Sequence, residues 1–158
     1  MISRLIVSFF AICLIQTTAI GQNMDNEKLE KILYVVSDTI TGQAGYWQMM
    51  LRELPILCMT DQTNNRMRII SPVSEMEDVT KKQLLKCMEA NFHTALDVKY
   101  AVSDEILWVA YIHPLKELSK NQVIDAITQV YNAAITYGDS YSSTNLTFPK
   151  KESNIKKN

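Results

Sequence analysis

The segment 106–112 limits the choice of fold more than any other part of this chain. It reads Ile-Leu-Trp-Val-Ala-Tyr-Ile, so both faces of an extended strand would carry apolar side chains. A strand of this kind is normally covered on both sides. We therefore expect a sheet with a helical layer on one face and, if that layer is single, some other cover on the opposite face.

Four more segments have the composition of β-strands. Residues 98–102 precede the apolar strand across the turn Ser103-Asp104-Glu105, which predicts a hairpin. Three others, 46–53, 56–60 and 66–71, are separated by Leu54-Pro55 and by a polar turn cluster at 61–65. In 66–71 arginines alternate with Met67 and Ile69, so one face of the sheet should be partly polar.

Three segments have the periodicity of amphipathic helices. The first, 24–39, repeats apolar residues at three- and four-residue steps and is followed by a glycine-containing stretch, 41–45. The second, 80–95, starts with the capping-box pattern Thr80-Lys81-Lys82-Gln83. Its expected buried stripe consists of Leu84, Leu85, Met88 and Phe92. Cys87 lies next to this stripe. The third starts at Ser119 with the same pattern and should stop near Gly138.

The element order is thus α-β-β-β-α-β-β-α. Runs of sequential strands between helices are typical of α+β domains. We predict an antiparallel sheet of about five strands, with the helices packed mainly on one face.

Residues 1–21 have the three parts of a secretory signal peptide. Arg4 is followed by the apolar run 5–15, and Ala19-Ile20-Gly21 suits signal peptidase, which predicts cleavage before Gln22. The run is too short to span a bilayer, which disfavours an uncleaved anchor, and Ile12 disfavours a lipoprotein signal at Cys13. We expect an exported, periplasmic or extracellular protein with no membrane segment after cleavage. It would comprise one domain, 22–148, and a disordered basic tail, 149–158.

Charge argues against nucleic acid as a partner. The chain has 16 basic and 17 acidic residues. A nucleic-acid-binding domain normally has a basic surplus gathered on one face.

The two cysteines beyond the signal peptide, Cys58 and Cys87, admit two roles. An even pair in an oxidising compartment suggests a disulfide. Each also lies in an apolar run, where a free cysteine acts as a small buried hydrophobe.

Catalytic candidates are few. The chain has two histidines, His93 and His113, and a small metal site or enzyme would require them to meet in space with a carboxylate such as Asp97. Pairing of a cysteine with a histidine is disfavoured, because apolar surroundings make a thiol unreactive. We predict no enzyme activity, no catalytic residue, no bound metal and no cofactor.

Protein binding is the better supported alternative. Five apolar side chains are candidates for one exposed sheet face: Trp47, Met49, Leu51, Met59 and Trp108. Such a face would attract a partner, and methionine adapts to partners of varied shape. The other reading is that the first helix or a loop covers this face.

Several stretches resemble one bacterial group, the sensory-transduction-regulator-like proteins, which share the fold of type III secretion chaperones. These stretches are 65–73, 90–92, 95–100, 112–118 and the long last helix ending at Tyr137-Gly138. The resemblance spans roughly residues 27–148. It implies the chaperone-like fold and, by analogy with the chaperones, a dimer that binds an extended protein segment on a sheet or helix surface. No catalytic residues come with it. Unlike those cytoplasmic, acidic chaperones, this chain is nearly neutral and has an export signal.

Overall fold

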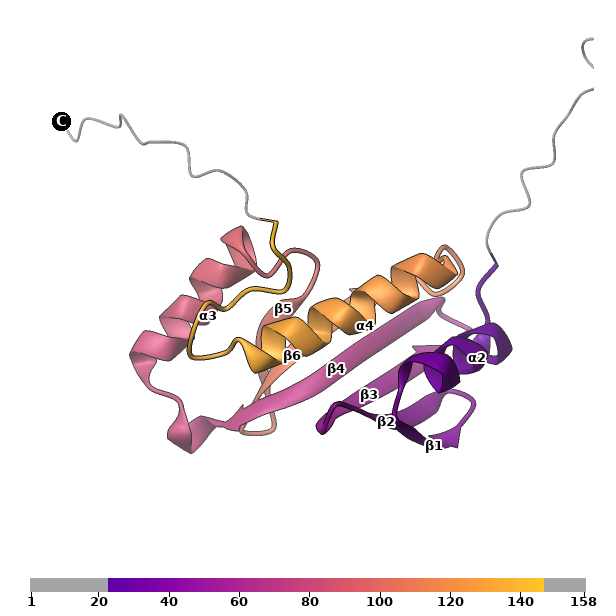
Figure 1. The fold of residues 1–158 in the computed structure, drawn as a ribbon, viewed down its shortest axis with the longest axis horizontal. Coiled ribbons are helices and arrows are strands. Elements are labelled where there is room, and N and C mark those ends of the chain that lie inside the picture. Colours follow the sequence, from indigo (N-terminus) through magenta and orange to yellow (C-terminus); the bar gives the residue numbers. More distant parts are fainter. Residues whose placement is uncertain (1–22, 147–158) are drawn as a thin grey trace, which may run out of the picture.

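The computed structural model describes residues 23–146, which form an α+β domain around one six-stranded antiparallel sheet of order β1-β2-β3-β4-β6-β5. The strands are β1 (Thr39–Gln43), β2 (Tyr46–Leu51), β3 (Leu54–Asp61), β4 (Arg66–Glu75), β5 (Lys99–Ser103) and β6 (Ile106–His113). The helices are α2 (Asn26–Val36), η1 (Met76–Asp78), α3 (Lys81–His93) and α4 (Lys120–Ile135). The predicted fold class is confirmed (Figure 1).

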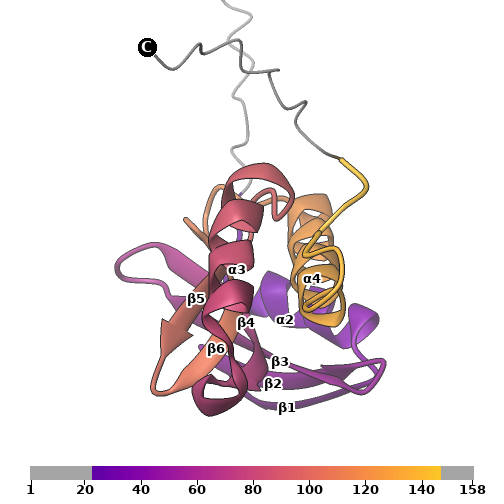
Figure 2. The same ribbon diagram turned by 90° about the vertical axis from the view of Figure 1, so that its left-hand side faces the viewer.

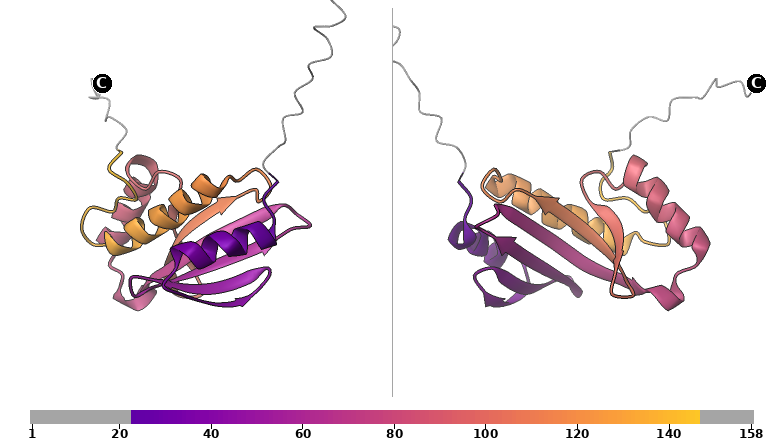
Figure 3. Two further views of the ribbon diagram at one scale, coloured as in Figure 1. Left: turned by 45° about the vertical axis from the view of Figure 1, so that its right-hand side comes forward. Right: turned by 180° about the vertical axis from the view of Figure 1, so that it is seen from behind.

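All three α-helices lie on one side of the sheet (Figure 2). Helix α4 crosses β4 and β6 and contacts α2, whereas α3 packs on β5 at one edge. Buried apolar side chains of the strands meet those of α2 and α4 in this layer. Figure 3 shows the sheet from two further sides, with the strands in front of α4 in the view from behind.

Strand β1 was not predicted, which is why the sheet has six strands and not about five. The sequence pattern predicts the end of the first helix and a loop at residues 39–43, but α2 ends at Val36. Four of the five β1 residues are exposed, so the strand has no apolar alternation to reveal it. Gly42 allows the tight return to β2, since a Cβ there would lie 2.3 Å from the Tyr46 carbonyl oxygen.

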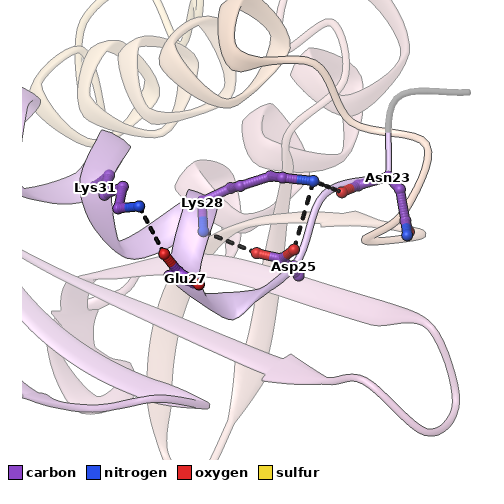
Figure 4. A network of polar contacts seen from close by, with 5 residues as sticks. All are labelled: Asn23, Asp25, Glu27, Lys28 and Lys31. Carbon is purple, nitrogen blue, oxygen red and sulfur yellow. Dashed lines mark hydrogen bonds and ion pairs between the residues drawn. The ribbon is translucent and has the colours of Figure 1, made fainter. Parts of the chain in front are cut away.

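Helix α2 begins at a polar network (Figure 4). The Asp25 carboxylate caps the helix by accepting a 2.8 Å hydrogen bond from the Lys28 amide, which holds the pKa of Asp25 below its usual range. Lys28 Nζ donates to the Asn23 carbonyl oxygen, and Lys31 pairs with Glu27 at 2.7 Å. The contacts are exposed, so they fix the helix start more than they stabilise the domain.

Helix α3 has the predicted start but not the predicted buried face. Its capping box is present at Thr80 and Gln83. However, Leu85, Met88 and Phe92 are exposed, Leu84 is only half-buried, and the buried residues are Cys87 and Ala90. The reason is position: α3 lies at the sheet edge and approaches β5 through small side chains, which turns its large apolar residues outward.

Helix α4 confirms its prediction more fully. Its capping box joins Ser119 and Gln122, and Val123, Ile127 and Val130 are buried on its inner side. Gly138, with a φ of 87°, follows the helix end. No helix within residues 23–146 is long and apolar enough to cross a bilayer. The predicted signal peptide and basic tail lie outside the described residues.

Candidate protein-binding face

The sheet face opposite the helices carries an apolar surface that we call the open face. Strand register brings its members together from neighbouring strands, because paired residues share one face. Its apolar members are Tyr46, Met50, Pro55, Leu57, Met59, Ile70, Trp108 and Ile112. No helix within residues 23–146 covers them, and Ile112 is 57% exposed. The doubly apolar strand 106–112 therefore has a cover on one side only.

Two of the five predicted binding residues belong to the opposite face. Trp47 and Met49 are 1% and 2% exposed and point into the core beneath the helices. The Trp47 Nε1–H donates a 2.9 Å hydrogen bond to Glu30 of α2, which satisfies the buried indole. Leu51 is half-buried on this same helix side, in a cleft with Val36 and Ile127. For these three residues the expected exposed face is wrong, because that surface of β2 packs on helices.

The other two, Met59 and Trp108, do lie on the open face. Both are half-buried. Trp108 Nε1 donates to the Ser103 carbonyl oxygen at 3.1 Å, which fixes its ring at the end of the sheet near the β5–β6 turn. Tyr46 and Met50, which lie on the same face, were not among the predicted residues.

A hollow of about 450 Å³ opens at the other end of the open face. Apolar and charged side chains line it together, including Met59, Ile112, Asp61, Arg66 and Arg68. The arginines confirm that one sheet face is partly polar. An extended peptide could combine apolar contacts here with charged ones.

A second hollow, of about 360 Å³, contains two of the three residues in the metal-site hypothesis. Asp97 and His113 line it with Asp125, whereas His93 does not. His93 instead makes an edge contact with the ring of Phe92, 4.8 Å away. Within residues 23–146 no group of three or more histidine, cysteine, aspartate or glutamate side chains is arranged to hold a metal ion.

The cysteines Cys58 and Cys87 are free, buried thiols in the structure. Burial raises the pKa of Cys58 to about 12 and that of Cys87 to about 11. Protonated thiols are poor nucleophiles, so neither residue has the environment of a catalytic cysteine.

Comparison with solved structures identifies the architecture. The domain superposes on the type III secretion chaperone SycH of Yersinia pestis, solved with a stable fragment of YscM2. The TM-score is 0.55 and the identity 13%, over 71% of this chain and 98% of that chain. The chain has the fold of the type III secretion chaperones. A chain of the HopA1–SchA chaperone–effector complex also matches, with TM-score 0.55 and 10% identity over 69% of this chain and 88% of that one. No family model and no curated protein matches the sequence.

Proposed function

We propose that this protein is a non-enzymatic binding module that holds an extended protein segment on its open face. The observation that carries the proposal is an apolar sheet face left uncovered by the helices. Contiguous apolar surface on one side of a soluble domain is typical of an interaction site. The two solved structures described above are complexes of a chaperone with a protein, which supports the same kind of activity here.

Export and kinship belong to the proposal as well. The signal-like segment 1–21 supports action in the periplasm or outside the cell. This part of the proposal requires that the mature protein begin at Gln22. The stretches that resemble sensory-transduction-regulator-like proteins support kinship with that group. The likeness to the secretion chaperones concerns the fold alone, so it does not assign this protein a role in type III secretion.

Methionine methyl groups provide a direct test. Met50 and Met59 lie on the open face, whereas Met24 and Met49 belong to the core and serve as internal controls. A peptide selected from a random displayed library is titrated into protein labelled at its methionine methyls. We expect shifts at Met50 and Met59 and none at Met24 and Met49.

A substitution pair makes the same test quantitative. Ile112→Glu puts a charge on the open face and should weaken peptide binding by about tenfold or more, as loss of a central apolar contact does. Val35→Glu changes an equally apolar side chain on α2, 76% exposed, and should leave affinity unchanged. Equal affinities for both variants, or shifts confined to the core methionines, would remove the open face as the binding site.

Self-association is a second candidate, favoured by α3. Leu85, Met88 and Phe92 are 56%, 49% and 80% exposed and recur at helical spacing, beside the unpaired edge of β5. A second copy could bury this stripe. Sedimentation analysis should then show a dimer that Phe92→Glu dissociates and Tyr34→Glu, on α2, does not. A wild-type chain that stays monomeric at all tested concentrations would contradict this.

A further inference from the structure

The second hollow lies where strand β6 outruns its neighbour. Strand β5 begins at Lys99, opposite Ala110, so β6 continues to His113 beyond that pairing. The chain segment between α3 and β5 supplies Asp97, and α4 supplies Gln122 and Asp125. Three elements thus bring two carboxylates and two aromatic rings around one cavity.

A buried amide fixes the two carboxylates. Gln129 is 1% exposed, and its Nε2 donates to Asp97 Oδ2 at 3.2 Å and to Asp125 Oδ2 at 2.7 Å. Its Oε1 accepts from the Asp97 amide at 3.2 Å. Within residues 23–146, neither carboxylate forms an ion pair, and the second oxygen of each accepts no hydrogen bond. Two exposed carboxyl groups are therefore held against one amide, and neither has a basic side chain as its ion-pair partner.

Tyr111 adds a polar group to the same hollow. The residue is only 7% exposed, and it lines the hollow. Its hydroxyl makes no hydrogen bond with another described residue, but it is not enclosed: within residues 23–146, the buried side-chain oxygen without a partner is that of Tyr137. Burial raises the pKa of Tyr111, and the nearby Asp97 and Asp125 carboxylates raise it further. The phenol therefore stays neutral, with lone pairs available to accept a hydrogen bond.

We propose that this hollow binds the cationic head of a lysine or arginine side chain of the segment that lies on the open face. This inference rests on the proposed function. Ile112 lines both this hollow and the one on the open face, so a bound segment could reach the site directly. Ammonium and guanidinium groups offer several donors, which suit two carboxylates and a phenol. None of the residues lining the hollow is a lysine or an arginine, although His113 is among them, and nearby Lys99 donates to the Leu96 carbonyl oxygen.

Capped amino acids test the site without a known partner. Nα-acetyl-lysine methylamide and the arginine equivalent are titrated into the ¹⁵N-labelled full chain, with the norleucine equivalent as neutral control. The two cations should shift the Asp97 backbone amide and the Gln129 side-chain amide, and norleucine should not. Asp97→Asn and Asp125→Asn should each weaken binding about tenfold, the expected loss for a charged hydrogen bond. Asp78→Asn removes an exposed acid from η1 and should change nothing.

Three results would overturn the inference. The first is absence of these shifts with either cation, and the second is tighter binding of Ca²⁺, Mg²⁺ or Zn²⁺ at the same resonances. The third is tighter binding of free 1,5-diaminopentane than of capped lysine, which would assign the site to a small amine. If a selected peptide still shifts the Met50 and Met59 methyls in the two Asp→Asn variants with unchanged affinity, only this inference fails. Loss of the methyl shifts in the wild type would remove the proposed function instead.

Discussion

Replacing Trp47 by alanine is expected to lower the free energy of unfolding by about 3–5 kcal/mol, the usual cost of truncating a large buried aromatic residue. Trp47 is 1% exposed, among the largest fully buried side chains. Its removal leaves a cavity between β2 and α2 and takes the indole donor away from Glu30. Because small domains have only about 5–15 kcal/mol of stability, the variant should be close to unfolding at room temperature. Urea denaturation followed by circular dichroism measures the change.

The adjacent residue is the matched control. Tyr46 lies one position away on the open face and is 41% exposed, so Tyr46→Ala should change stability by only about 0.5 kcal/mol. If Tyr46→Ala proved the more destabilising of the two, the assignment of the two faces of β2 would be reversed. A Trp47 variant is also unsuitable for testing binding, because it would lose the fold together with the surface.

The second large effect is on thiol reactivity. A thiol with a pKa of about 12 is ionised about a thousandfold less than one with a pKa of 9, and one of about 11 about a hundredfold less. Alkylation by iodoacetamide near neutral pH proceeds through the thiolate, and both thiols are fully buried. Native Cys58 and Cys87 should therefore react more slowly than an unfolded thiol by at least these factors. Peptide mass spectrometry after timed labelling assigns the rate to each cysteine.

Labelling of the unfolded protein provides the reference rate and also tests whether Cys58 and Cys87 form a disulfide. In guanidinium without reductant, two free thiols should take up label at Cys58 and Cys87 at the rate of ordinary cysteines. Failure of both to react until a reductant is added would show a disulfide, contrary to the free thiols of the structure. Cys58 is completely buried in the structure, so rapid labelling of native Cys58 would show that the core around β3 opens far more readily than this burial implies.

The order of the elements could be predicted because strong local signals mark them. Capping boxes identify the starts of α3 and α4, and the apolar run of 106–112 identifies β6. Strand β1 gave no such signal, because an exposed edge strand of five residues needs no apolar alternation. The buried face of α3 could not be predicted either. Periodicity shows that a helix has an apolar stripe, not that the rest of the domain covers it.

The binding face was harder to predict because it depends on which residues of neighbouring strands pair with each other. Alternation separates Trp47 from Tyr46 but does not say which of them faces the helices. In the structure Tyr46 pairs with Met59 and Trp47 pairs with Cys58, so Tyr46 shares the open face with Met59 and Trp47 shares the buried face with Cys58. The predicted face combined Trp47 with Met59, which a shift of one residue in register would allow. Pairing partners depend on the turn between β2 and β3, which local composition does not define.

The junction between β4 and β6 has a consequence for how the chain folds. Strands β1 to β4 form a meander of neighbouring hairpins, and β5 and β6 form another hairpin, so both units can close through short loops. Joining them requires β4 to find β6 across the intervening α3 and β5, which costs more chain entropy. Helix α4 spans this seam, and it is the last element within residues 23–146. We therefore expect these residues to complete their fold only after α4 has been synthesised.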